Sequence, residues 1–327
     1  MDQLYRSGYL SHAQQAYTLR RVTLEEGAAR GTQVIEVVTA DGLSVDILPD
    51  TGLDIGQARY RGRNVTFISK NGYDSPFRAG REHGFLRSFP GGLLYTCGMR
   101  STGGPHSDGD EWHPQHGRYH SLPAEQVCAF ADGDTLVVRG VVRETALFGC
   151  HLELTRVIRI PIFGADITVA DTLVNRGHAP EEFVLLYHCN FGWPLLSDTA
   201  ELLLPEQRRT SPRNADAAAG LGQEQRCTAP IPVGTVPERV FFHEDMAHAV
   251  TLRNAPQGMQ MTLTWSDTLP ILAQWQNMIA GDYVLGLEPA NNYILGRRQE
   301  RENGTLPVLA PGESLRTEVH FHFESAH

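Results

Sequence analysis

Lysine is almost absent from this chain of 327 residues, because Lys70 is the only one. Chemistry that needs a lysine Schiff base, including that of pyridoxal phosphate, would have to use this single residue. Acidic residues outnumber basic ones by 38 to 28, which gives a net charge of -10. This excess argues against nucleic acid or an anionic membrane as the main partner, since both repel a negative surface. Neutral and cationic small molecules are compatible with it.

Cysteines are few, and their spacing shows no pairing pattern. The five cysteines are widely spaced, odd in number and contain no C-x-x-C motif, so neither a disulfide framework nor a zinc knuckle is expected. No run of about 18 apolar residues occurs, and the first residues lack the basic and apolar regions of a signal peptide. We therefore expect a reduced, cytoplasmic protein that does not insert into a membrane.

Phosphate-binding loops are missing as well. Gly91-Gly92 and Gly103-Gly104 precede no Lys-Ser/Thr pair and stand outside any strand-helix-strand pattern. Residues 50–56 combine Asp and Gly as metal loops do, but their spacing fits no EF-hand, and a turn between two strands is favoured. No nucleotide cofactor is supported, and we expect none of any kind.

Short β-forming segments are abundant. The last is the clearest, because Leu315, Val319 and Phe323 share one face while Arg316 and His320 share the other. Turn residues separate this segment from the others, which are residues 32–38, 44–48, 135–142, 151–160, 166–174, 249–253 and 259–265. Helical patterns are few and short. This spacing predicts an all-β fold, a large antiparallel sandwich or barrel.

The chain shows no repeat and no break in composition that would divide it. We therefore predict a single domain over residues 1–327. Residues 1–30 form an N-terminal extension that packs on it, with a short helix around residues 10–16. Residues 208–232 are polar and rich in Ala and Gly, which indicates a long surface insertion.

Two apolar stretches end in residues suited to acid-base chemistry. Residues 185–194 carry His188 before a Gly-Trp-Pro turn, and residues 283–289 deliver Glu288 to a proline. Each has an ordinary explanation, since a lone histidine on an apolar segment is usually a hydrogen-bonded core residue and a glutamate at a strand end is usually solvated. Together they are candidates for a pair that faces across a sugar.

Between residues 81 and 125 the chain is rich in polar and titratable side chains. They are His83, Arg87, His106, Asp108, Asp110, Glu111, His113, His116, Arg118 and His120. Such clusters can ligate zinc or iron, although no H-E-x-x-H motif is present and the only H-x-H, His320 with His322, is distant in sequence. Alternatively, His116, Arg87 and His106 bind sugar hydroxyls while Trp112 or Trp193 stacks on a ring.

A succession of short motifs resembles the aldose 1-epimerase (galactose mutarotase) superfamily, and within it a bacterial aldose-epimerase-like branch. The motifs extend over most of the chain in the order found in that family. They are Phe85-Leu86-Arg87, Gly91-Gly92-Leu93-Leu94, Cys97-Gly98, His116-Gly117-Arg118, Leu122-Pro123-Ala124, Leu154-Thr155-Arg156, Asp171, Asn175-Arg176-Gly177, residues 187–192, Leu287-Glu288-Pro289 and Pro311-Gly312-Glu313.

The resemblance implies a galactose mutarotase-like β-supersandwich of antiparallel strands with an open cleft. By position in the family's motifs, Glu288 would be the base, His188 the acid, His116 the second active-site histidine and Arg87 a sugar-binding arginine. Asp245 is the nearest match to an aspartate between the acid and base segments. The histidine and aspartate segments differ from those of galactose-specific members, so galactose is not assigned as the sugar.

Interconverting α and β anomers requires one base on the C1 hydroxyl and one acid on the ring oxygen. Burial behind Leu287 and Pro289 is expected to raise the pKa of Glu288 towards neutrality, and His188 beside it is expected to stay protonated near pH 7. This reaction needs no cofactor or metal.

Three functions are compatible with these residues. The first is a cofactor-free mutarotase acting on a free sugar or a close derivative. The second is a carbohydrate-binding protein that keeps the cleft without turnover, although a pure binder has no need of both an acid and a base. The third is a metal-dependent sugar isomerase with a cupin-like barrel. A homodimer is compatible with all three, and Arg297, Arg298 and Arg301 leave an anionic sugar open.

Overall fold

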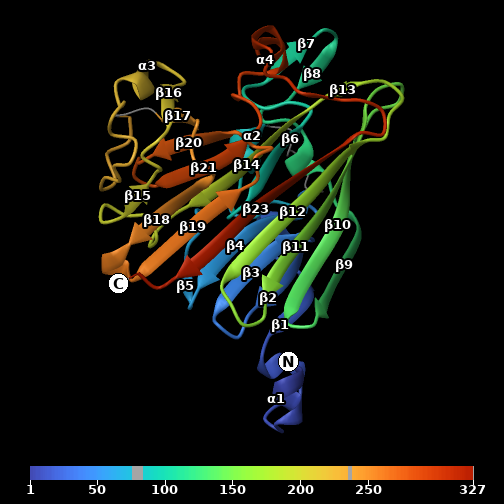
Figure 1. The fold of residues 1–327 in the computed structure, drawn as a ribbon, viewed down its shortest axis with the longest axis vertical. Coiled ribbons are helices and arrows are strands. Elements are labelled where there is room, and N and C mark those ends of the chain that lie inside the picture. The colour runs from blue at the N-terminus through green and yellow to red at the C-terminus, as the bar shows by residue number, and fades with distance from the viewer. Residues whose placement is uncertain (76–83, 235–237, 327) are drawn as a thin grey trace.

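The computed structural model describes residues 1–75, 84–234 and 238–326, and antiparallel strands make up most of its regular secondary structure (Figure 1). A sheet of eight strands has the order β15 (Glu201–Leu203), β18 (Ala249–Asn254), β19 (Met259–Trp265), β23 (Ser314–Glu324), β12 (Asp166–Asn175), β11 (His151–Pro161), β10 (Thr135–Thr145) and β9 (Glu125–Asp132). Every strand predicted from the sequence is present in it or in the five-stranded sheet, with bounds shifted by at most a few residues. The all-β prediction is therefore confirmed.

Two further large sheets complete the sandwich. The five-stranded sheet has the order β1 (Thr18–Thr23), β2 (Gln33–Val38), β3 (Leu43–Leu48), β4 (Asp54–Tyr60) and β5 (Arg63–Asn64). The six-stranded sheet has the order β16 (Arg209–Pro212), β17 (Arg239–Glu244), β20 (Ile271–Asn277), β21 (Val284–Ala290), β14 (Val184–Phe191) and β6 (Tyr95–Met99). Two small pairs are β7 (His106–Asp108) with β8 (Glu111–His113), and β13 (Glu181–Glu182) with β22 (Val308–Leu309).

Helices are short and peripheral. The α-helices are α1 (Asp2–Arg6), α2 (Phe85–Ser88), α3 (Ala215–Ala218) and α4 (Arg297–Asn303), and the 3₁₀ turns are Ala13–Gln15, Gly27–Ala29, Tyr119–Ser121 and Ala255–Gln257. The N-terminal α1 projects at the bottom of Figure 1 and buries none of its residues. Strand β1, in the predicted extension, instead joins the five-stranded sheet. No helix in the described ranges is long and apolar enough to cross a membrane.

The main core draws side chains from all three large sheets. Strand β12 alternates between buried and half-buried residues, as expected when one face of a sheet is covered. Strand β14 is different, because all eight of its residues are buried. Leu185, Tyr187 and Cys189 join the main core, whereas Leu186 belongs to a second apolar cluster on the opposite face. The central strands of the six-stranded sheet are therefore covered on both faces.

Candidate functional site

His188 and Glu288 lie side by side on the second face of the six-stranded sheet. Strands β14 and β21 are antiparallel neighbours that pair Leu186 with Ala290 and Cys189 with Leu287. This register sets His188 opposite Glu288 on the face that points away from the main core. His188 Nε2 lies 3.3 Å from Glu288 Oε1, and the two residues are only 5% and 2% exposed. The sheet thus brings together two residues that are 100 positions apart in the chain.

Space for the Glu288 carboxylate comes from a glycine two residues earlier on the same face. A Cβ atom at Gly286 would lie 2.4 Å from Glu288 Oε1 and 3.1 Å from the Cβ of Trp275. Any larger residue at this position would therefore displace the carboxylate. Within the described chain, neither Glu288 Oε1 nor His188 Nδ1 has a hydrogen-bond partner. Buried polar atoms without partners are uncommon in folded proteins and mark candidate functional sites.

The two side chains open into a cavity of ≈ 430 Å³, a size that can hold a small ligand. Its other lining residues come from α2 and the residue after it, the segments that follow β6, β8 and β16, the strands β17 and β20, and the segments before β17 and α4. They are Phe85, Leu86, Phe89, Gly103, Gly104, Gln115, His116, Arg213, Glu238, Val240, Trp275, Ile294 and Leu295.

His116 is the second histidine that lines this cavity. Its ring centre lies 5.9 Å from that of His188 and 5.0 Å from that of Phe85. The backbone of His116 has a φ of 59°, which is uncommon for a residue other than glycine. Two backbone hydrogen bonds hold this conformation, since His116 N donates to Gly103 O and His116 O accepts from Gly98 N. The predicted pair and the predicted second histidine therefore meet in one cavity.

Burial shifts the protonation of all three groups. It raises the pKa of Glu288 to about 8, an effect that Arg213 opposes and Glu238 reinforces. Burial, with repulsion from His116, lowers the pKa of His188 to about 3. The pKa of His116 falls to about 4 for the same reason, with a contribution from Arg213. At neutral pH the pair therefore holds one proton, and that proton is on Glu288.

The raised pKa of Glu288 confirms the sequence-based expectation, whereas the expectation for His188 is wrong. A protonated imidazole near pH 7 would need a carboxylate beside it to compensate for lost solvation. Glu288 is itself buried and protonated, so it supplies no such charge.

The sequence did not reveal a polar chain of residues along one wall of the cavity. Arg213 donates from Nη2 to Glu238 Oε1 at 3.1 Å, and Trp275 donates from Nε1 to Glu238 Oε2 at 2.8 Å. Arg213 follows β16, inside the segment interpreted as a surface insertion. That segment is therefore more than an insertion, because it adds an edge strand to the sheet and a cation to the cavity. Because the segment is polar, the sequence pattern indicated neither the edge strand nor the cavity arginine.

Five residues proposed for the site do not line the cavity, namely Arg87, His106, Trp112, Trp193 and Asp245. Asp245 follows the end of β17, is exposed and accepts a hydrogen bond from Arg209 Nε at 3.0 Å. Trp193 is 69% exposed beyond the end of β14. Arg87 is exposed on α2, whose Phe85 and Leu86 are the residues that line the cavity. Asp245 and Trp193 lie beyond the ends of β17 and β14, so the pairing of the strands does not place them near Glu288.

Part of the histidine-rich segment forms the β7–β8 hairpin. Its Asp108 forms ion pairs with Arg297 and Arg301, which also pair with Glu182. These two arginines are therefore neutralised and do not make an anion site, contrary to the sequence-based alternative. His83 lies outside the described residues. Within the described ranges, no group of three or more His, Cys, Asp or Glu side chains is placed to hold a metal ion.

Comparison with known proteins agrees with this architecture. Residues 29–323 match the family described as "Domain of unknown function (DUF4432)". No curated protein matches the sequence. Among solved structures, a candidate aldose 1-epimerase from Klebsiella pneumoniae superposes with a TM-score of 0.86 at 24% identity, covering 95% of this chain and 84% of that chain.

Two more distant structures share the same arrangement. A galactose mutarotase-like protein from Clostridium acetobutylicum has a TM-score of 0.66 at 14% identity and covers 95% of this chain and 99% of that chain. A galactose 1-epimerase from Lactobacillus acidophilus has a TM-score of 0.64 at 13% identity, with coverage of 95% and 100%. The chain therefore belongs to the DUF4432 family and has the galactose mutarotase-like sandwich fold.

Proposed function

We propose that this protein is a cofactor-free mutarotase of the aldose 1-epimerase type, which interconverts the α and β anomers of a reducing sugar. The observation that carries this proposal is the His188–Glu288 pair, two buried groups 3.3 Å apart with unpaired polar atoms beside a ligand-sized cavity. The names of the structural neighbours support the same class of reaction. A carbohydrate-binding role without turnover is the alternative.

The single proton held by the pair is sufficient for ring opening, because one proton is taken from the sugar and one is given to it. One member takes the proton of the C1 hydroxyl while the other gives its proton to the ring oxygen, the C1–O5 bond breaks and the C1 aldehyde forms. Rotation about C1–C2 and the reverse transfers close the ring as the other anomer. Since the proton rests on Glu288, Glu288 begins as the acid and His188 as the base. Transfer of that proton to His188 on sugar binding would restore the opposite assignment, with Glu288 as base.

Sugar hydroxyls need donors and acceptors in the cavity wall. His116 offers an unpaired Nδ1, and Arg213 and Glu238 add a cation and a carboxylate to the lining. We propose that Glu238 supplies the acidic contact for which Asp245 was a candidate, because Glu238 lines the cavity and Asp245 does not. Trp275, held by Glu238, offers an aromatic face for a ring.

Glu288→Gln tests the proposal most directly. The amide keeps the shape of the carboxyl group but cannot exchange a proton, so anomer exchange should fall by on the order of 100-fold or more. Saturation-transfer NMR on a panel of neutral, deoxy and acidic reducing sugars measures this exchange, and also identifies the class of sugar.

The matched control is Glu144→Gln. Glu144 is also a buried glutamate with a raised pKa, but it accepts a hydrogen bond from Met99 N and does not line the cavity. Full exchange in this variant, with loss in Glu288→Gln, would support the proposal. Unchanged exchange in Glu288→Gln would overturn the assignment of Glu288, and binding without exchange in the unmodified protein would favour the sugar-binding alternative.

A further inference from the structure

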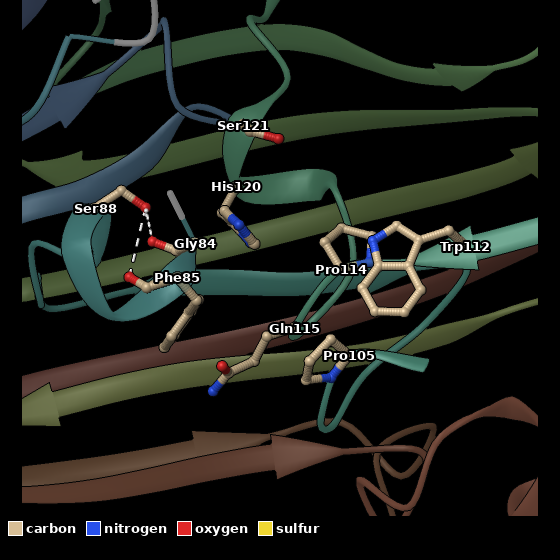
Figure 2. Close-up of a pocket in the computed structure, with 10 residues that line it drawn as sticks. Gly84, Phe85, Ser88, Pro105, Trp112, Pro114, Gln115, His120 and Ser121 are labelled. Carbon is tan, nitrogen blue, oxygen red and sulfur yellow. Dashed lines mark hydrogen bonds between the residues drawn. The ribbon is translucent and has the colours of Figure 1, made fainter. Parts of the chain in front are cut away.

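A second cavity adjoins the one that contains His188 and Glu288. It has a volume of ≈ 560 Å³, and Phe85 and Gln115 line both cavities. Figure 2 shows its walls, with Phe85 and Ser88 from α2 on one side, His120 and Ser121 from the Tyr119–Ser121 turn above, and Trp112 and Pro114 on the other side. Each cavity is large enough for a small ligand by itself, so together they exceed what one sugar ring requires.

The two cavities differ in charge. The first contains Arg213, Glu238 and Glu288, whereas none of the described residues that line the second is acidic or basic apart from His120. His120 is buried and stacks on Tyr95 at 4.8 Å. The nearby Arg118 is directed elsewhere, because its Nη2 donates to Trp112 O and its Nη1 lies 3.6 Å from Glu111. Among the described residues of its lining, a phosphate or carboxylate would find no compensating charge.

Trp112 gives the second cavity an aromatic wall. Its side chain is 55% exposed, so the indole ring is accessible to a ligand in this cavity. The position of the indole is set by strand β8, since Arg118 holds Trp112 O and the ion pairs of Asp108 with Arg297 and Arg301 anchor the hairpin. Pro105 and Pro114 add apolar surface beside it. An aromatic face flanked by small polar groups suits the C–H face of a sugar ring.

We propose that the second cavity is a subsite for a neutral glycosyl unit attached to the reducing sugar, so that the preferred substrate is a neutral reducing disaccharide. This inference rests on the proposed function. The reducing ring lies against His188 and Glu288, and the second ring stacks on Trp112. Gln115 lines both cavities, so its amide is placed to contact both rings.

The test compares disaccharides with their monosaccharides. Saturation-transfer NMR gives kcat/KM for glucose and galactose, and for maltose, cellobiose and lactose as neutral disaccharides. At least one disaccharide should exceed its monosaccharide. Trp112→Ala should lower that disaccharide's kcat/KM by about tenfold or less, the range of one aromatic contact, and leave the monosaccharide unchanged. Trp193→Ala, an exposed tryptophan outside both cavities, is the matched control.

Failure of the subsite is distinguishable from failure of the proposed function. Monosaccharide exchange with no gain for any disaccharide, or equal losses for both in Trp112→Ala, would overturn the subsite alone. A larger gain for a sugar phosphate would also overturn it. If the protein accelerates anomer exchange of no sugar, the proposed function fails. Calorimetric titration of sugar binding then tests the subsite. Tighter binding of a disaccharide that weakens in Trp112→Ala would then support it, and equal binding of both sugars would reject it.

Discussion

Two groups of buried ionisable residues lie on opposite faces of the sheet that contains β6 and β14, and they differ in how their polar atoms are used. Behind the sheet, Arg156 is fully buried between the large sheets, and all its guanidinium nitrogens are occupied. It donates to both oxygens of Asp171 at 2.9 and 2.7 Å, to Asp54 at 2.6 Å and to Thr96 at 2.9 Å. Tyr187 donates to Asp171 at 2.7 Å. In front of the sheet, Glu288 and His188 keep unpaired atoms.

This contrast separates a structural role from a chemical one. A buried ion cluster with satisfied hydrogen bonds holds strands together and offers nothing to a ligand. A buried pair with unsatisfied atoms and shifted pKa values is costly unless a ligand uses it. Tyr187 and His188 are consecutive in β14, so one strand anchors itself in the first group and presents the second.

Arg156→Met should break the satisfied group and have the largest effect on stability. Removing the guanidinium leaves Asp171 and Asp54 buried without their cation, which should lower the free energy of unfolding by about 3–5 kcal/mol. Urea unfolding of the variant measures this loss. Arg159→Met, an exposed arginine on the same strand β11, should change it by less than about 0.5 kcal/mol. Similar small effects in both variants would contradict the structural role.

Gly286→Ala should act on the other group and reduce activity more than stability. The new Cβ would lie 2.4 Å from Glu288 Oε1 and displace the carboxyl group from its position opposite His188. Misplacement of a reacting group by about 1 Å can cost on the order of 100-fold in rate. Anomer exchange by NMR measures it on the sugar found with the unmodified protein. Gly164→Ala, at the turn between β11 and β12, is the control, and equal rates in both variants would argue against this geometry.

The free energy of unfolding between pH 6.5 and 8 should depend on pH because Glu288 is protonated in the folded state. Its folded pKa of about 8 exceeds the ordinary value of 4.5, so the folded state keeps a proton that the unfolded chain loses, and stability falls as pH rises. His188, lowered from 6.5 to about 3, contributes in the opposite sense only up to about pH 6.5. Above that value the fall from Glu288 should reach about 2 kcal/mol.

Urea unfolding at pH 6.5 and 8 tests this for the unmodified protein and for Glu288→Gln. The variant should lose the contribution of about 2 kcal/mol, whereas Glu144→Gln should keep most of it, because the pKa of Glu144 rises only to about 7. An identical pH dependence in the unmodified protein and in Glu288→Gln would show that Glu288 is not protonated at neutral pH.

Much of the architecture could be predicted, because local patterns of apolar, polar and turn residues indicate where the strands begin and end. Strands such as β12, β19 and β23 alternate apolar and polar residues over their length, and turn residues bound them. Strand β4 was harder to predict, because Asp54 and Gly56 read as part of a turn while Asp54 is a buried partner of Arg156. A charged residue in a sequence usually indicates an exposed position, whereas a residue in a buried ion pair lies in the core.

The sequence by itself determined the antiparallel β fold and the two strands that carry His188 and Glu288, because apolar runs and turns are local properties of the chain. Only the tertiary structure decided that these residues face each other, since that depends on the register between β14 and β21. It also decided that Arg213 and Glu238 line the cavity while Asp245 and Trp193 do not. Proximity of this kind arises from the pairing of distant strands, which no single stretch of sequence encodes.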